Sequence, residues 1–267
     1  MSLHVEDSGA GEPLVLLHGW GLNSRVWDSV IPTLARNFTV IRIDLPGHGA
    51  SSWPPGFHDL ASLAAVLAPA LPSRYSLLGW SLGGVAAIET ALRQTERIDH
   101  LVLVSTTPRF LRMEGAGADD WPHGLAVAAV ERFATLLETD YEATVREFLG
   151  LQAQGDEHAR ATLRELRQKL LAGGQPRLEA LRAGLDVLRS ADVREQLPRL
   201  AVPTLVVAGQ YDRMTPPGAA RALAAAIPGA RLELIARAGH APFLSHAGEF
   251  CRSITAFLTR AARETGT

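Results

Sequence analysis

The amino-acid sequence predicts an α/β protein with a mostly parallel, doubly wound sheet and a helical cap inserted before the penultimate strand. Three observations lead to this prediction. Strand-length apolar runs alternate with helix-length amphipathic stretches over about the first hundred residues, as in successive βαβ units. Residues 108–197 then show helical periodicity without a convincing strand. Two further strands follow, so this helical segment interrupts the sheet.

The predicted strands are continuous apolar runs rather than alternating ones. Leu, Val and Ile dominate them, as expected for parallel strands that helices cover on both faces. In chain order we predict strands at Pro13–Leu17, Phe38–Asp44, Tyr75–Gly79, Ile98–Ser105, Thr204–Gly209 and Arg231–Ile235.

The predicted helices connect these strands and build the cap. The cap should lie over the carboxyl ends of the strands, which is where open α/β sheets place their sites. We expect residues 1–107 and 198–267 to form the core and residues 108–197 the cap. The helices of the core are predicted at Ser24–Leu34, Asp59–Leu71, Gly83–Gln94, Pro217–Ile227 and Ser245–Arg263, and those of the cap at Glu131–Leu151 and His158–Leu171.

Composition excludes several classes of function. The chain is 47% apolar and 20% charged, which is ordinary for a globular domain. Its formal net charge of −2 gives no basic excess with which to bind a nucleic-acid backbone. The single cysteine, Cys251, excludes an internal disulfide and a cysteine-built zinc site. No apolar run of about 18 residues and no leader pattern occur, so we expect a soluble, cytoplasmic protein.

The most informative motif places a serine between a strand and a helix. A serine on such a tight turn has a strained backbone and an exposed side chain, and the glycines on either side allow neighbouring backbone to pass closely. A pattern this short also arises by chance, so its position between the two elements is what makes it informative. The motif reads Gly79-Trp80-Ser81-Leu82-Gly83.

A serine hydroxyl is a weak nucleophile, so this hypothesis requires a base and an acid that orients it. The motif demands the chain order Ser, then Asp or Glu, then His. Asp212 follows the strand Thr204–Gly209, and His240 follows the next strand. Ser81, Asp212 and His240 are therefore expected at one sheet edge. Two structural alternatives remain open: Asp212 as a cap of the following helix, and His240 as a packed loop residue.

Acyl transfer also needs hydrogen-bond donors for the oxyanion. The amide of Leu82, next after the serine, is one candidate. The second is the amide of Trp20, in the loop that follows the first predicted strand. In the same loop, His18 is expected to be a structural hydrogen-bonding residue rather than a second base.

The segment Gly19–Ser24 also allows a dinucleotide-binding loop. Its pattern is G-x-G-x-x-S, and Asp44 ends the next strand at about the required distance. Ser24 replaces the third glycine, however, and this alternative leaves the serine, aspartate and histidine unexplained. We therefore interpret Asp44–Gly49 as a structural loop. No metal-ligand spacing occurs, so neither a metal nor a cofactor is expected.

Taken together, these motifs resemble the α/β-hydrolase superfamily over essentially the whole chain, so the α/β-hydrolase fold is expected. A closer similarity is to the pimeloyl-[acyl-carrier protein] methyl ester esterase family. It rests on Trp20, the elbow Gly79–Gly84, the cap stretch Phe148–Gln152, His240–Phe243, and Ser245 with His246. The cap stretch is the most telling part, because caps differ most between branches of the superfamily.

The resemblance implies a cytoplasmic, cofactor-free carboxylesterase that removes the methyl group from a pimeloyl chain carried on acyl carrier protein. We expect the enzyme to be a monomer without nucleic-acid or membrane partners. The resemblance also implies that cap arginines meet the acidic carrier, here Arg160 and Arg164. Two other arginine places hold Ala143 and Glu147, with Arg146 one residue away. The residues implied to line the substrate pocket are Trp20, Ser81, Leu82, Phe148, Leu149, Gly150, Leu151, Gln152 and His240.

Other functions remain open on the same motifs. A broad-specificity carboxylesterase or a carbon–carbon bond hydrolase would carry the same three catalytic residues, because specificity depends on the cap. A non-enzymatic ligand-binding protein of this fold is a further alternative. The intact serine, aspartate and histidine argue against it, since a pure binding protein has no need of them. The two arginines could also form a solvated face that pairs with Glu157 or Glu165.

Overall fold

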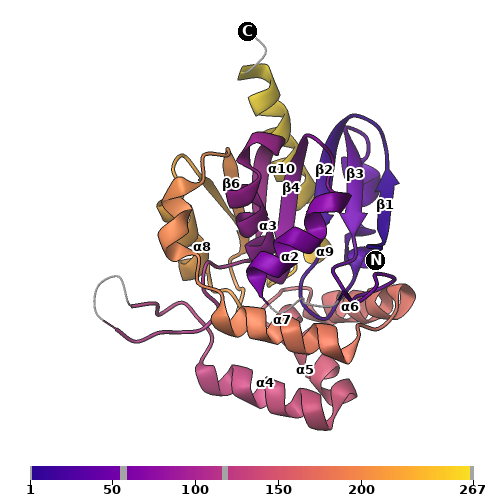
Figure 1. The fold of residues 1–267 in the computed structure, drawn as a ribbon, viewed down its shortest axis with the longest axis vertical. Helices are drawn as coiled ribbons and strands as arrows, with labels where there is room; N and C mark the ends of the chain where they lie inside the picture. Colours follow the sequence, from indigo (N-terminus) through magenta and orange to yellow (C-terminus); the bar gives the residue numbers. More distant parts are fainter. Residues whose placement is uncertain (1, 55–58, 116–119, 265–267) are drawn as a thin grey trace.

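Seven strands of the described chain form one central sheet (Figure 1). The computed structural model describes residues 2–54, 59–115 and 120–264, with side chains as far as residue 259. The strand order is β1-β3-β2-β4-β5-β6-β7, in which β1 is antiparallel to β3 and the other neighbours are parallel. The predicted mostly parallel sheet is thus confirmed. The strands are β1 (Val5–Ser8), β2 (Glu12–Leu17), β3 (Phe38–Ile43), β4 (Tyr75–Trp80), β5 (Ile98–Val104), β6 (Thr204–Gly209) and β7 (Arg231–Ile235).

All six predicted strands are present, with ends that differ by at most one residue, whereas β1 was not predicted. β1 lies at the sheet edge and pairs only with β3, from Val5 opposite Ile43 to Ser8 opposite Val40. Its side chains alternate between exposed and half-buried positions. A four-residue edge strand with one strongly apolar residue does not produce the continuous apolar run that marks a covered parallel strand.

Helices cover both faces of the sheet, and each face has its own apolar core (Figure 1). Because successive side chains of a strand point to opposite faces, Leu77 belongs to one core and Leu78 to the other. This explains why the strands are apolar throughout. The first face is covered by α2 (Leu60–Leu67), α3 (Leu82–Arg93) and α8 (Pro217–Ala226), and the second by α1 (Ile31–Leu34), α9 (Pro242–Ser245) and α10 (Ala247–Glu264).

Three of the predicted core helices are interrupted. The first, Ser24–Leu34, consists of the 3₁₀ turn η1 (Ser24–Trp27) followed by the one-turn helix α1. The predicted helix 59–71 ends as α2 at Leu67, and a 3₁₀ turn containing Pro69 follows, because proline lacks the amide that an α-helix requires. The predicted helix 245–263 begins only after His246, which leaves helical geometry at φ −130°.

The cap helices lie between β5 and β6 in the chain, before the penultimate strand as predicted. They are α4 (Val127–Thr139), α5 (Tyr141–Ala153), α6 (Ala159–Gly173) and α7 (Leu178–Ser190). They gather at the lower end of the sheet in Figure 1. There, a Cβ on Gly184 of α7 would lie 2.5 Å from the Trp20 ring, which places α7 on the loop after β2. The expected position over the carboxyl ends of the strands is confirmed.

Two predictions about the cap were wrong in detail. The predicted helix 131–151 is two helices, because Asp140 adopts φ −150° and its side chain accepts a hydrogen bond from the Ala143 amide at the start of α5. The first part of the insertion is also not helical. In its described residues it forms isolated β-bridges, among them Arg109 with Asp192 and Met113 with Trp121. No helix in the described ranges has the length and apolar character needed to span a bilayer.

Candidate active site

Ser81 lies on the turn between β4 and α3 in a strained backbone conformation. Its φ of 55° is positive, which is rare for a residue with a side chain. The turn is fixed from two sides: the Ser81 amide donates to the Val104 carbonyl at 3.0 Å, and the Thr106 hydroxyl donates to the Ser81 carbonyl at 2.7 Å. A Cβ on Gly79 would collide with the Gly83 carbonyl, so the glycine is required. Strain held this way is typical of functional turns.

Asp212 and His240 form a buried pair. The distance from His240 Nδ1 to Asp212 Oδ2 is 2.8 Å, and both residues are about fully buried. A carboxylate only accepts hydrogen bonds, so Nδ1 carries the proton and Nε2 is left as the basic nitrogen. The carboxylate also accepts bonds from the amides of Met214 and Thr215 and from the Thr215 hydroxyl, at 2.7–2.9 Å. These contacts orient Asp212 toward the imidazole.

The alternative role of Asp212 as a helix cap does not fit this geometry. The residue that caps α8 is Pro216, and no side chain forms a capping hydrogen bond there. Asp212 instead closes the turn before the helix and directs its second oxygen to His240. The pair is therefore built into the loops that follow β6 and β7.

His240 lines a cavity, and its other ring nitrogen is unpaired in the described structure. Among the described residues, Nε2 is buried and has no hydrogen-bond partner, and both His240 and Ser81 line the same cavity. The imidazole is held by its backbone: the Trp80 indole donates to the His240 carbonyl at 2.8 Å, and the His240 amide donates to the Gln152 carbonyl at 3.3 Å. An unpaired buried acceptor costs about 1–3 kcal/mol, which a purely structural histidine would avoid.

Two residues whose amides are candidate oxyanion donors lie near the serine. Leu82 is the first residue of α3, so its amide has no acceptor within the helix. The loop after β2 passes close by, since a Cβ on Gly19 would lie 3.3 Å from the Ser81 Cβ. This close approach places the neighbouring residue, Trp20, beside the elbow. Its indole donates to the Leu181 carbonyl of the cap at 2.9 Å, which fixes the loop.

The geometry does not support the alternative of a dinucleotide loop. One oxygen of the Asp44 carboxylate accepts from the Ser24 amide at 2.7 Å, and the other accepts from the Ala50 amide at 2.9 Å. Both oxygens therefore close loops of the protein, and the Asp44 side chain is buried, which fits a structural role rather than contact with a ribose hydroxyl. His18 is a structural residue as predicted: Nδ1 donates to the Gly19 carbonyl, and Nε2 accepts from the Leu45 amide. Burial lowers the pKa of His18.

The chain is similar to known proteins over most of its length. The family model described as alpha/beta hydrolase fold matches residues 12–247. The chain belongs to the alpha/beta hydrolase fold family. It is 42% identical over 249 residues to the pimeloyl-[acyl-carrier protein] methyl ester esterase of Nitrosomonas europaea, with 93% of this chain and 96% of the relative covered. The protein of the same name from Aeromonas hydrophila is 40% identical over 259 residues, with 97% and 100% covered.

Solved structures of other alpha/beta hydrolases agree with this fold. A bromoperoxidase from Bacillus anthracis has a TM-score of 0.86 and 26% identity, with 96% of this chain and 95% of that chain covered. An esterase from Exiguobacterium antarcticum has a TM-score of 0.85 and 25% identity, with the same coverage. The resemblance predicted from the motifs is confirmed both for the superfamily and for the closer set of relatives.

The cavity of this alpha/beta hydrolase lies between the sheet edge and the cap and has a volume of about 190 Å³. Of the pocket residues implied by the resemblance, Trp20, Ser81, Phe148, Leu151 and His240 line it. The Phe148 ring packs edge-on against the Trp20 ring at a centroid distance of 4.6 Å. The cavity therefore joins the serine and histidine to the cap stretch that the sequence singled out.

Not every residue of the cap stretch 148–152 faces this cavity, because consecutive helical residues point in different directions. Leu149 belongs to the core on the other side, together with Leu166 and Leu170 of α6. Gly150 is exposed, and a Cβ there would have no neighbour within 4 Å. Gln152 is buried, and its backbone carbonyl accepts a hydrogen bond from the His240 amide. Leu82 is buried at the elbow but does not line the cavity.

Sequence reasoning missed most of the cavity wall. These residues come from the irregular start of the insertion, from α4 and α7, from the position directly after α5, and from the turn after Asp212. Nothing but the apolar faces of the cap helices pointed to them. They are Phe110, Leu125, Ala129, Val130, Arg132, Phe133, Gln154, Leu185, Leu188, Arg213, Met214 and Thr215.

The two arginines predicted to meet a partner lie on the surface of α6. Arg160 and Arg164 are exposed, and neither forms an ion pair with any residue that the structure describes. The alternative pairing with Glu157 does not occur, because the Glu157 carboxylate contacts Arg237, His158 and His246. These two cap arginines are therefore accessible cations.

Proposed function

We propose that the chain is a serine carboxylesterase that hydrolyses the methyl ester of a pimeloyl chain carried on acyl carrier protein. The observation that carries the proposal is the arrangement around the cavity. A strained serine and a histidine with an unpaired Nε2 share its wall, and a buried carboxylate holds the opposite ring nitrogen. The names of relatives about 40% identical over nearly the whole chain support the choice of substrate.

In the proposed reaction, Ser81 Oγ attacks the ester carbonyl while His240 Nε2 accepts the hydroxyl proton. The negative charge of Asp212 stabilises the resulting imidazolium. The amides of Leu82 and Trp20 donate to the oxyanion of the tetrahedral intermediate. The intermediate collapses when His240 returns the proton to the methoxy oxygen, so methanol leaves and an acyl-enzyme remains. A water molecule, deprotonated by His240, then releases the free carboxylic acid and regenerates the serine.

The character of the cavity suits this substrate. Its wall is mostly apolar, with Phe110, Val130, Phe133 and Leu185 among its residues, and such a wall accepts a chain of methylene groups. A methyl ester is uncharged, so it can enter this wall without the cost of burying a carboxylate. The free acid formed by the reaction carries that charge, which favours release of the product.

Recognition of an acidic carrier must come from a local basic surface, because the net charge of the chain is −2. Arg160, Arg164 and Arg167 follow one another at intervals of four and three residues, so they form one exposed stripe along α6. Arg167 also lines a groove of about 370 Å³ between α5 and α6, together with Arg146 of α5. We propose that this stripe binds the carrier and that Arg146 replaces the arginines absent at Ala143 and Glu147.

Several broader expectations complete the proposal. The core is formed by residues 1–107 and 198–267 and the cap by residues 108–197. The enzyme acts as a monomer in the cytoplasm and needs no cofactor for ester hydrolysis. Treatment with a chelator should therefore leave its turnover unchanged.

The direct test is turnover of a pimeloyl methyl ester attached to acyl carrier protein, followed by mass spectrometry of the carrier. The wild type should remove one methylene equivalent of mass from the carrier, and Ser81→Ala should not. Ser190→Ala, which changes an exposed serine of the cap, serves as the matched control and should remain active. Rapid turnover of short p-nitrophenyl esters without action on the carrier substrate would favour a broad-specificity esterase, and cleavage of ring-cleavage diketones would favour a carbon–carbon bond hydrolase.

A further inference from the structure

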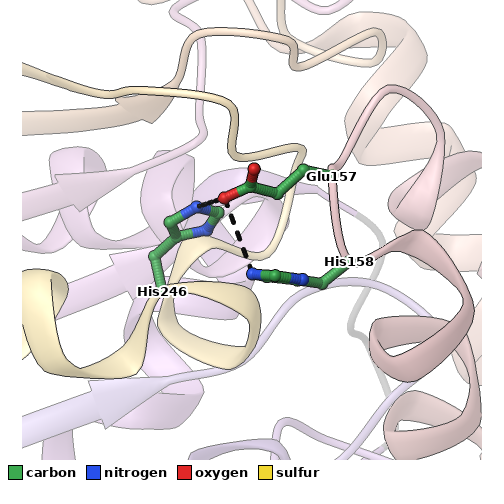
Figure 2. A group of neighbouring side chains, drawn as sticks. All are labelled: Glu157, His158 and His246. Atoms are coloured by element: carbon green, nitrogen blue, oxygen red, sulfur yellow. Dashed lines mark hydrogen bonds and ion pairs between the residues drawn. The ribbon is translucent and has the colours of Figure 1, made fainter.

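Two histidines and a glutamate meet where the cap joins the core (Figure 2). Glu157 and His158 lie in the connection between α5 and α6, and His246 lies between α9 and α10. His246 Nε2 is 3.0 Å from Glu157 Oε1, and His158 Nε2 is 3.5 Å from the same oxygen. Both rings thus point their Nε2 atoms at one carboxylate oxygen, as Figure 2 shows.

The spacing of these three atoms suits a metal ion. They all lie within 4.8 Å of one another. Zinc binds histidine nitrogen and carboxylate oxygen at about 2.0–2.2 Å, so neighbouring ligands of a tetrahedral site lie roughly 3.3 Å apart. The two nitrogen–oxygen distances already match this separation. His158 is about half exposed, so an ion can enter from solvent and keep a water molecule as its fourth ligand.

Contacts around the cluster hold the ligands in position. The Ser245 hydroxyl lies 2.8 Å from His246 Nδ1 and can accept a hydrogen bond from the N–H group there when Nε2 binds a metal. Such a bond to the second ring nitrogen is usual for metal-bound histidine. Arg237 Nη1 lies 3.0 Å from Glu157 Oε2, which fixes the carboxylate and leaves Oε1 free to face the rings. The guanidinium charge also repels a cation, so it limits the affinity of the site.

We propose that Glu157, His158 and His246 form a zinc-binding site that links the cap to the core. Two imidazoles and one carboxylate favour zinc, whereas magnesium and calcium prefer sites made of oxygen ligands. Both imidazoles bind as neutral groups, with their remaining proton on Nδ1. No redox or covalent step is involved.

The site is structural rather than catalytic. None of its three residues lines the cavity that contains Ser81. It lies next to the loop that carries His240, because the Glu157 amide donates to the Arg237 carbonyl at 3.1 Å and His246 follows α9 directly after that loop. A bound ion therefore joins the segment after α5 to the segment before α10. Its effect is to stabilise the packing of the cap on the core.

The test uses untagged, full-length protein that has been treated with a chelator, dialysed and titrated with zinc chloride in a calorimeter. We expect one zinc ion per chain and a rise in Tm of about 5 °C or more at a free zinc concentration near 100 times Kd. His158→Gln and His246→Gln should each weaken zinc binding by more than about tenfold. His158 lies at the surface, so its replacement should not disturb folding.

Two further variants sharpen the test. His4→Gln is the matched control, because His4 and Glu6 form a half-buried pair at 3.0 Å that has no second imidazole in the described structure. Its zinc affinity should equal that of the wild type. Arg237→Gln should bind zinc more tightly, since a neighbouring cation is removed. Magnesium chloride should not raise the Tm.

The proposal is overturned if the wild type shows no saturable zinc binding, or if the His158 and His246 variants bind zinc as the wild type does. Unchanged affinity in Arg237→Gln would also contradict the effect assigned to the guanidinium beside Glu157. Every measurement concerns zinc binding or thermal stability rather than ester turnover. The result is therefore independent of the proposed esterase function.

Discussion

Replacing Asp212 with asparagine tests how the buried pair prepares the base. The Asp212 carboxylate accepts four hydrogen bonds, including the one from His240 Nδ1 at 2.8 Å. In Asp212→Asn, one oxygen can still accept from the amides of Met214 and Thr215, and the new NH₂ group then faces His240. Two N–H groups cannot bond to each other, so the imidazole must move its proton to Nε2 and loses the free nitrogen that accepts the serine proton.

The expected loss in kcat is about 10⁴-fold, by analogy with other triads in which the same change produces the wrong tautomer. This corresponds to about 5.4 kcal/mol in activation free energy. Turnover of a short p-nitrophenyl ester measures the loss, and thermal unfolding checks that the variant is folded. Asp99→Asn is the control, because Asp99 pairs with Arg74 near the start of β5, away from the carboxyl ends of the strands. A folded Asp212→Asn protein that loses less than about tenfold in rate would refute the reasoning.

Three further predictions follow from the structure. Arg160→Glu combined with Arg164→Glu should sharply lower kcat/KM for the carrier-bound ester and remove the salt dependence of that kcat/KM. Turnover of a free ester should change little. Equal losses on both substrates would assign the arginines to cap folding. Asp156 accepts hydrogen bonds from the amides of Gly239 and His158 at 2.9 and 2.6 Å. Asp156→Asn should therefore reduce kcat about tenfold with little change in KM. An unchanged kcat would contradict a role of Asp156 in positioning the loop that carries His240. Burial lowers the pKa of His48 to about 3, so the folded protein keeps this ring neutral, whereas the unfolded chain takes up a proton below about pH 6.5. The free energy of unfolding should therefore fall by about 1.4 kcal/mol from this group between pH 7.5 and 5.5, and urea titrations of His48→Gln should lack that contribution.

The positions of the candidate catalytic residues followed from the sequence because parallel strands order their ends in space. Ser81, Asp212 and His240 each lie in the turn or loop that follows an apolar run, and these runs end at the same sheet edge. Chain order and strand position together were enough to pair Asp212 with His240. No knowledge of side-chain packing was required.

The remaining features depended on tertiary contacts that leave little mark on local sequence. β1 is an edge strand whose pairing with β3 compensates for its lack of apolar residues. The break between α4 and α5 depends on one hydrogen bond of Asp140. The cavity wall forms where α4 and α7 pack over the elbow. The apolar faces of these helices could equally pack elsewhere, so the sequence does not predict that contact. Glu157 and His246 are 89 residues apart, so only the fold brings them together.

Covalent labelling by a fluorophosphonate tests the central claim most directly, because the probe reacts only with an activated serine. The wild type should be labelled once, and peptide mapping by mass spectrometry should place the phosphonate on Ser81. Ser81→Ala should not react, and Asp212→Asn should react far more slowly than the wild type. Labelling at another serine, or an unreactive wild type that is correctly folded, would contradict the assignment of Ser81 as the nucleophile that His240 and Asp212 activate.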